Sequence, residues 1–390
     1  MMYLIGIDVS KYKHDCFIAT DAGEVIQDSF TFKNDAKGFQ TLLDTLHRLD
    51  PNQTKRIGLE ATGHYGYNLK VFLDRHGFHF MELNPYLVKK LSTGLSLRKT
   101  KTDAVDAKLL SMILLSVDYK VYPVQSYHIY DLKSLTRYYK DLVKKHSKEL
   151  VVLTNLLDSM FPEFKAFFQD HFSKTALYVL EHYQTPEKIG KMTIQSYEKL
   201  RNISRGHFSY AQFIHLKNLA KNTIGTSSPT LVFKLESSLR VIQTFNQEIQ
   251  DVELRLKDWA NRIHSPVFSI RGIGLISALS IIAEYGSFDA FDSPAQMLSF
   301  AGLEPSVNQS GTSNPKGHMV KRGSGYLRET IMNVAVSFMM HNPVIYEYYL
   351  KKKREGKSHR VALSHVAKKM IRILFHLVKS NVSFQSSKLV

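Results

Sequence analysis

Tyr-Leu-Ile-Gly-Ile-Asp, at residues 3–8, is the stretch that decides the fold of the N-terminal part of the chain. An apolar run of this length, closed by a carboxylate, predicts a buried strand that ends at Asp8. Two more strands are predicted at 15–20 and 25–32, joined by a turn at Asp-Ala-Gly 21–23. Three strands in direct succession indicate a β-meander.

Helices and strands alternate after this meander. The predicted elements are a helix at 36–48, a strand at 56–60, a helix at 67–75, a strand at 78–83 and a helix from 102 to about 115. A meander followed by strand–helix crossovers predicts a mixed sheet covered by helices. This is the order expected of an α/β domain of the ribonuclease-H-like kind.

The middle of the chain has helical patterns at 131–155 and 231–263. In the second stretch apolar residues recur every three or four positions, as in a coiled-coil-like seam of about four heptads. Its members are Leu235, Leu239, Ile242, Ile249, Val252, Leu256, Trp259 and Ile263. A helix packed within its own domain and an intermolecular coil both fit this pattern. Residues 164–229 suggest no function.

Short helices punctuated by glycine are expected from residue 266 onward, in a mostly α C-terminal part. We therefore predict three domains: an α/β catalytic domain at 1–125, a helical coiled-coil or linker region at 126–264, and a C-terminal domain at 265–390. A length of 390 residues fits two or three domains better than one.

Composition points to a polyanionic partner. Lysine and arginine total 52 against 35 acids, a net charge of +17, and 44% of the residues are hydrophobic, which supports packed cores. One cysteine, Cys16, excludes a disulfide framework and a cysteine-ligated zinc site within one chain. No signal-peptide pattern and no apolar run of the ~18 residues that span a bilayer occur. We expect a cytoplasmic protein that meets nucleic acid and no membrane.

Four carboxylates stand out by their positions. Asp8 ends the first strand, Glu60 ends the fourth, and Asp103 and Asp106 lie three residues apart at the start of a helix, so they share a face. The first and fourth strands should be neighbours and the helix should cross their ends, so we expect the four to converge. Each acid alone has a simpler explanation as a turn residue or a partner of the helix dipole.

Converging carboxylates repel one another unless a cation neutralises them. Oxygen-only ligands favour Mg²⁺ or Mn²⁺, and two such ions about 4 Å apart can activate a phosphodiester for cleavage. Basic residues flank these acids and are predicted to contact nucleic acid, with a solvated charged face as the alternative. They are Lys11, Arg98, Lys99 and Lys101, with Lys108 beside them.

The C-terminal part carries three further patterns. Gly272-Ile273-Gly274 between apolar stretches resembles a helix–hairpin–helix turn that offers backbone N–H groups to a DNA phosphate. A tight turn in which glycine supplies a positive φ is the alternative. The polar segment 309–328 suits a phosphate-binding loop or a plain surface loop, and its basic residues are Lys316, His318, Lys321, Arg322 and Arg328. The run 351–354 beside Tyr346, Tyr348 and Tyr349 suits phosphate contact and base stacking, or a solvated helix face.

Several of these stretches resemble the DEDD transposases of the insertion-sequence 110 family. In the N-terminal part they are Gly-Ile-Asp-Val-Ser-Lys at 6–11, Leu-Glu-Ala-Thr-Gly-His-Tyr at 59–65 and Lys-Thr-Asp-Ala-Val-Asp-Ala at 101–107. In the C-terminal part they are Ile-Arg-Gly-Ile-Gly at 270–274, Phe-Ala-Gly-Leu-Glu-Pro at 300–305, Gln-Ser-Gly at 309–311 and Lys-Arg-Gly-Ser-Gly-Tyr-Leu-Arg at 321–328. The resemblance covers roughly residues 3–150 and 265–380.

The resemblance implies a mechanism as well as a fold. It implies a RuvC-like domain whose metal ligands are Asp8, Glu60, Asp103 and Asp106, and a serine nucleophile at Ser310, with Ser306 and Ser313 close by. It implies elements that move through a circular double-stranded intermediate. It also implies a structured guide RNA that bridges donor and target DNA, and a homo-oligomer, dimer or tetramer, in which domains of different subunits meet.

Three other functions compete with this one. A RuvC-like nuclease or resolvase would use the same acids without a covalent serine intermediate. An actin-like or sugar-kinase-like ATPase also begins with a strand ending in Gly-Ile-Asp, but it usually has glycine where this chain has Ser10. A basic scaffold that binds nucleic acid without catalysis would not need the acids.

Overall fold

The computed structural model describes residues 1–60, 64–83, 88–89, 91, 102–116, 127–304 and 319–388. By its internal contacts the chain divides into two compact units. One unit holds Met1–Asp131, Tyr285–Arg328 and Ala367–Val382. The other holds Leu132–Glu284, Glu329–Val366 and Ser383–Val390.

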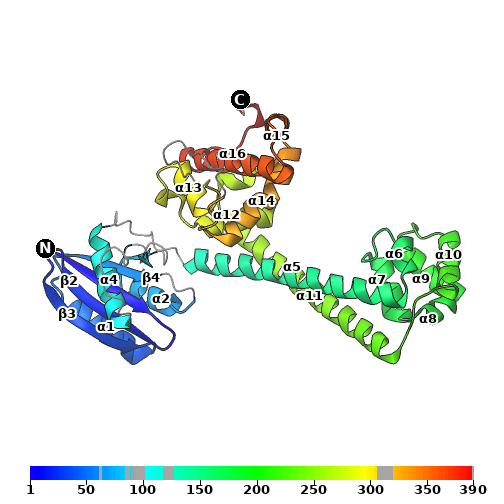
Figure 1. Ribbon diagram of the computed structural model, residues 1–390, viewed down its shortest axis with the longest axis horizontal. Coiled ribbons are helices and arrows are strands. Elements are labelled where there is room, and N and C mark those ends of the chain that lie inside the picture. The colour runs from blue at the N-terminus through cyan, green and yellow to red at the C-terminus, as the bar shows by residue number, and fades with distance from the viewer. Residues whose placement is uncertain are drawn as a thin grey trace. The chain divides into compact units, whose positions relative to one another are not determined.

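A five-stranded mixed sheet forms the N-terminal part of the first unit (Figure 1). Its strands are β1 Met2–Val9, β2 Lys13–Thr20, β3 Val25–Lys33, β4 Thr54–Glu60 and β5 Phe80–Leu83, in the order β3-β2-β1-β4-β5. β1 to β3 form an antiparallel meander, whereas β4 pairs parallel to β1 and β5 pairs parallel to β4. The predicted meander and crossovers, and the predicted pairing of the first and fourth strands, are confirmed.

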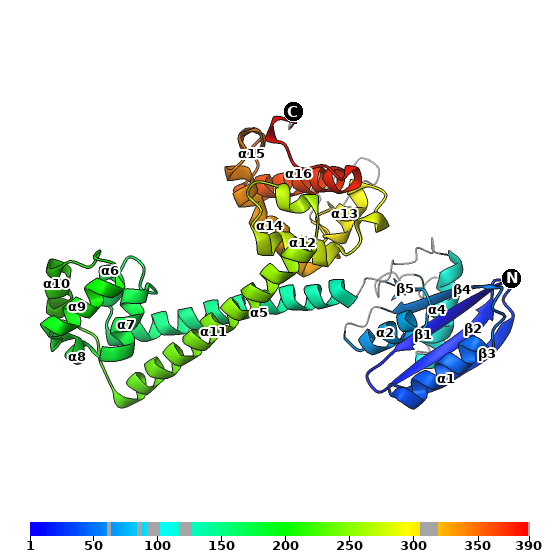
Figure 2. The same ribbon diagram turned by 180° about the vertical axis from the view of Figure 1, so that it is seen from behind.

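Helices cover both faces of this sheet, as the two opposite views show (Figures 1 and 2). Helices α1 (Ala36–His47) and α2 (Tyr67–Arg75) pack their leucines against one face of the sheet. Helix α4 (Asp103–Ser116) packs on the other face, where Leu110, Ile113 and Leu114 meet Leu4 of β1.

Two glycines let α4 lie close to the sheet. A Cβ atom added at Gly6 of β1 would stand 2.1 Å from the main-chain oxygen of Ala107 and 2.5 Å from the main-chain nitrogen of Ser111. Gly58 of β4 is the parallel partner of Gly6, and a Cβ there would stand 2.9 Å from a methyl carbon of Leu114. The backbones of α4 and β1 therefore approach one another at a point where no side chain fits.

The second unit is built on two long helices, α5 (Tyr127–Met160) and α11 (Pro229–Arg262), which run side by side (Figure 1). Between them in sequence, five shorter helices form a separate apolar core with Leu153, Leu157 and Leu235. These helices are α6 Glu163–Phe167, α7 Lys174–Tyr183, α8 Pro186–Gly190, α9 Ile194–Ile203 and α10 Tyr210–Lys221.

The apolar seam predicted on α11 is used inside this chain. Leu235, Leu239 and Ile242 belong to the core with the short helices, and Val252 and Leu256 pack with Leu132 and Leu142 of α5. Polar contacts also join the two helices, since Ser238 donates to Glu149 at 2.7 Å and the Tyr139 hydroxyl donates to Glu253 at 3.0 Å. The helix packed within its own domain is the interpretation that these contacts support.

An ion pair ties α5 to helix α12 (Leu275–Tyr285). The guanidinium of Arg137 donates to both oxygens of Glu284, at 2.6 and 2.9 Å, and the Glu284 side chain is 2% exposed. The described residues after α11 are also mostly helical, as predicted. Besides α12, their elements are η1 Pro266–Ser269, η2 Phe288–Ala290, α13 Pro294–Phe300, α14 Gly325–Met340, α15 Pro343–Arg354, α16 His359–Ser380 and η3 Ser386–Lys388.

The predicted three-domain division stays a prediction, since the two compact units follow contacts rather than those boundaries. Across the described ranges, no helix is both long enough and apolar enough to cross a bilayer.

Replacing Gly6 by Ala tests the close approach of α4. We expect the free energy of unfolding to fall by about 1–3 kcal/mol. The fall should lie at the upper end of this range, because the added Cβ clashes with main-chain atoms that cannot rotate away. Hydrogen exchange followed by mass spectrometry should show faster exchange in β1 and α4. Gly274→Ala is the matched control, since a Cβ there meets nothing within 4 Å. Equal protection of α4 in Gly6→Ala and wild-type protein would contradict the packing described.

Candidate metal centre and nucleic-acid surface

Strand alternation brings Asp8 and Glu60 to one face of the sheet. Side chains of a strand point to opposite faces in turn, so Leu4, Gly6 and Asp8 share the face that α4 covers. In β4, Gly58 and Glu60 share that face for the same reason. Because β1 and β4 are parallel neighbours, both carboxylates lie at the ends of adjacent strands on the α4 side.

Helix α4 adds the other two acids. Asp103 is its first residue and Asp106 lies three positions on, so both lie in the first turn of the helix. Thr102 begins the helix, because its hydroxyl accepts a hydrogen bond from the main-chain N–H of Val105 at 3.3 Å. One turn further along, Ala107 and Leu110 are buried against the sheet. The acids therefore start the helix face that continues into the core.

Electrostatics show that these carboxylates interact. Burial first, and then the negative charges of Asp106, Asp103 and Glu60, raise the pKa of Asp8 to about 6 from the ordinary 3.8. An ionised Asp8 thus stands in a field of other acids, which a cation would relieve. Within the described residues, no three histidine, cysteine or carboxylate side chains form a complete metal-binding group. The donors are all oxygens, which is the ligand type that Mg²⁺ and Mn²⁺ prefer.

A fifth acid, Asp15, was not among the sequence-predicted site residues. It lies in β2 directly opposite Asp8, and its side chain is 6% exposed. The hydroxyl of Thr31 donates to Asp15 Oδ1 at 2.5 Å. Lys13 Nζ lies 3.6 Å from Asp15 Oδ2 and 3.0 Å from Asp103 Oδ2, and both carboxylates raise the pKa of Lys13. The available signal was an acid directly before the apolar run 16–19, within a predicted strand.

The basic residues predicted around the acids are described only in part. Lys11 is exposed, and its ammonium lies 4.8 Å from the ring centre of Tyr12. Lys108 is exposed on α4, with its ammonium 5.6 Å from the ring centre of Phe17. Arg98, Lys99 and Lys101 lie outside the described residues.

Ser310 also lies outside the described residues, together with Ser306, Ser313, Lys316 and His318. The residues that bracket the segment 305–318 are described, and they meet: the N–H of Val320 donates to the carbonyl oxygen of Glu304 at 2.8 Å. Lys321 and Arg322 follow and are exposed. Arg328 donates to the carbonyl oxygen of Ala301 at 3.5 Å, so its guanidinium lies against the turn after α13.

The glycines of the predicted helix–hairpin–helix have a packing role. Gly272 has a φ of +90°, and a Cβ there would stand 2.7 Å from the carbonyl oxygen of Ser337 in α14. Gly274 precedes α12 and has open space around its Cα. The conformation and packing of Gly272 are accounted for by the tight-turn alternative, and its contact with phosphate stays a prediction.

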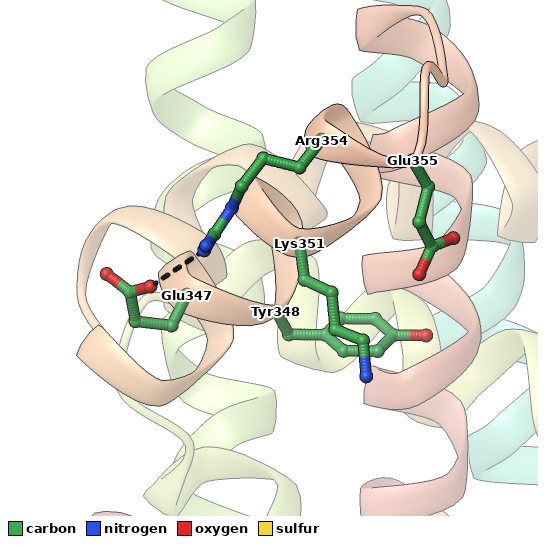
Figure 3. A pocket seen from close by; sticks show the side chains of 5 residues that line it. All are labelled: Glu347, Tyr348, Lys351, Arg354 and Glu355. Atoms are coloured by element: carbon green, nitrogen blue, oxygen red, sulfur yellow. Dashed lines mark hydrogen bonds and ion pairs between the residues drawn. The ribbon is translucent and has the colours of Figure 1, made fainter.

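Helix α15 carries the basic run 351–354 beside an open pocket (Figure 3). The pocket is lined by Glu347, Tyr348, Lys351, Arg354 and Glu355. Two cations of the run have acidic partners on the same surface, since Arg354 lies 3.5 Å from Glu347 and Lys352 lies 2.8 Å from Glu355. These pairs offset part of the positive charge that the sequence places here.

Two family models match this chain. Residues 5–162 match a model described as Transposase, and residues 264–350 match one described as Transposase IS116/IS110/IS902 family. The first range contains all four acids, and the second contains Ser310 and the glycine turn at 272–274. Together the two ranges span more than half of the chain.

Curated relatives agree with these matches. The "Insertion element IS116 uncharacterized 44.8 kDa protein" of Streptomyces clavuligerus is 24% identical over 97% of this chain and 95% of its own length. The "Insertion element IS110 uncharacterized 43.6 kDa protein" of Streptomyces coelicolor is 30% identical over 31% of this chain and 30% of its own. The "Pilin gene-inverting protein" of Moraxella bovis is 24% identical over 97% of both chains. The chain belongs to the IS116/IS110/IS902 family of transposases and is a DNA transposase or recombinase.

Proposed function

We propose that this protein is an insertion-sequence transposase that cuts and rejoins DNA at a Mg²⁺-dependent site formed by Asp8, Glu60, Asp103 and Asp106. The observation that carries the proposal is the placement of Asp8 and Glu60 at the ends of the parallel neighbours β1 and β4, on the face of the sheet that α4 covers. The raised pKa of the partly buried Asp8 supports it, because burial and then the charges of the other three carboxylates cause the rise. A family of DEDD transposases suggests divalent-metal use, and the oxygen-only donor set fits Mg²⁺ or Mn²⁺.

We assign the N-terminal sheet to the ribonuclease-H-like, RuvC-like class. The support is the strand order β3-β2-β1-β4-β5, with a meander on one side of β1 and parallel strands on the other. The ends of β1 and β4 lie side by side in this topology. It therefore accounts for an acid at the end of each of these strands.

The four acids have distinct placements in this proposal. Asp8 and Glu60 come from the rigid sheet, and Asp103 and Asp106 come from the first turn of α4. A divalent ion bound by them would supply positive charge to the scissile phosphate. The chain's own task is to hold the carboxylates in fixed positions, to which the close packing of α4 at Gly6 contributes.

Ser310 is the nucleophile in the same proposal. Its hydroxyl oxygen attacks the scissile phosphorus and loses its proton, so that a serine–phosphate ester forms. The bond from phosphorus to one sugar oxygen breaks, and that oxygen takes up a proton. The pairing of Glu304 with Val320 closes the base of the segment that carries Ser310. Gln309-Ser310-Gly311 is the motif that assigns the role, with Ser306 and Ser313 as the alternatives.

DNA is the substrate that the family implies, and we propose donor and target DNA together with a structured guide RNA. The +17 charge suits several phosphate backbones at once. Proposed contacts are Lys11, Arg98, Lys99, Lys101, Gly272, Gly274, Lys316, Lys321, Arg322 and Arg328. A homo-oligomer, dimer or tetramer, would bring Ser310 of one subunit to the acids of another.

Asp8→Asn should abolish DNA cleavage in Mg²⁺. The variant should also be at least as stable as wild type at about pH 7.5, for a reason of linkage. Between 3.8 and about 6 the native protein holds a proton on Asp8 that the unfolded chain has released, so this carboxyl lowers stability as the pH rises through that window. Asparagine does not ionise, so the variant avoids this loss of stability. Cleavage assays and urea unfolding measure both effects, and a fully active Asp8→Asn would remove Asp8 from the site.

The same pKa predicts how the bound metal responds to pH. Binding needs the Asp8 carboxylate, so Mn²⁺ affinity should fall as the pH drops below about 6, in addition to any loss from acids of ordinary pKa. Calorimetric titration of Mn²⁺ at several pH values measures the affinity as a function of pH. That profile is the reference against which Mn²⁺ binding by Asp8→Asn is compared.

A covalent protein–DNA adduct should form at Ser310 on a nicked suicide substrate. Mass spectrometry of the trapped peptide maps the attachment. Ser310→Ala should abolish both the adduct and recombination while leaving DNA binding intact. An adduct at Ser306 or Ser313 moves the assignment. Recombination by Ser310→Ala without any adduct favours a RuvC-like nuclease instead.

Nucleic-acid affinity should fall steeply with salt, because each Lys or Arg contact releases counterions. Expression with the native flanking DNA should yield a discrete copurified RNA. Filter binding at several salt concentrations and sequencing of the bound RNA measure these properties. Random RNA fragments in repeated preparations would contradict a guide RNA.

A further inference from the structure

A series of polar contacts runs from the edge strand β3 to the start of α4. Thr31 of β3 donates to Asp15 of β2, Lys13 lies against Asp15, and the same ammonium lies 3.0 Å from Asp103. No role was predicted for Lys13 or Asp15 from the sequence. The last residue in this series of contacts, Asp103, is one of the four acids of the proposed metal site.

The two carboxylates that contact Lys13 differ in burial. Asp15 is 6% exposed and is fixed by Thr31, whereas the side chains of Lys13 and Asp103 are 48% and 49% exposed. A half-exposed ion pair is weak, because water screens it. Lys13 therefore bridges the buried Asp15 and the half-exposed Asp103, and the closer of its two contacts, with Asp103, is the one that water screens on both sides.

We propose that Lys13 is a built-in counter-cation of the acidic site, which a divalent ion displaces from Asp103 and which then contacts a phosphate of the bound DNA. This inference rests on the proposed metal site. A divalent ion and the Lys13 ammonium compete for Asp103, and they repel one another. Lysine suits the exchange, because it carries a compact charge on a flexible four-carbon stem and can move between acceptors.

Metal affinity tests the competition directly. Lys13→Met should bind Mn²⁺ about two- to fivefold more tightly than wild type in calorimetric titration at low salt, as the loss of one exposed ion pair predicts. Lys13→Arg keeps the charge and should bind as wild type does. Lys37→Met is the control for net charge, since Lys37 is exposed on α1, which covers the opposite face of the sheet.

The outcomes separate the two proposals. If wild-type protein binds no Mn²⁺, the proposed metal site fails. If wild type binds Mn²⁺ and Lys13→Met binds it equally or more weakly, the counter-cation role of Lys13 is wrong while the metal site stands. An equal gain in Lys37→Met would also contradict that role, because net charge alone would then account for the effect.

DNA binding tests the second half of the exchange. With Ca²⁺, which should occupy the site without supporting cleavage, Lys13→Met should lower DNA affinity and reduce the slope of log affinity against log salt by about 1. With chelator and no divalent ion, Lys13→Met and wild type should bind DNA alike. An equal loss under both conditions would show that Lys13 contacts DNA without being released by metal, and would overturn the exchange.

Discussion

The close contact of α4 with β1 at Gly6 is the constraint on which the candidate site depends. A side chain at position 6 would occupy the place of the Ala107 carbonyl, 2.1 Å from where its Cβ would stand. Since Asp103 and Asp106 lie in the turn before Ala107, this contact sets how near they come to Asp8 at the end of the same strand. The absence of a side chain at Gly6, two residues before Asp8, thus determines how close the negative charges of α4 come to Asp8.

That charge is unfavourable on its own. Asp8 is partly buried, and the acids around it raise its pKa. The chain supplies one internal remedy, since Lys13 links Asp103 to the buried Asp15. Repulsion among the carboxylates destabilises the protein, and a bound cation would relieve it. The same repulsion therefore favours the binding of a divalent ion. Replacing Asp8 should for that reason cost activity without costing stability.

Sequence alone predicted the N-terminal elements well because apolar runs, turn residues and helical spacing mark them clearly. The apolar run before Asp8, the two strands joined by a turn at 21–23 and the helix starting near Thr102 all match observed elements. The convergence of the four acids was inferred from that order and stays a prediction. The pairing of Asp15 with Asp8 was not inferred, because it depends on hairpin register, which the apolar pattern of β1 and β2 leaves open. The apolar seam of α11 was ambiguous because its pattern does not show which helix packs against it. In the structure, α5 forms much of the surface that the seam contacts.

The account depends most on the claim that the four acids form one cation site. Soaking crystals with Mn²⁺ and recording its anomalous scattering tests this claim most directly. The account predicts a Mn²⁺ peak bounded by Asp8, Glu60 and the first turn of α4, which is lost in Asp8→Asn. A peak elsewhere with none among these carboxylates, or one unchanged in Asp8→Asn, would contradict it.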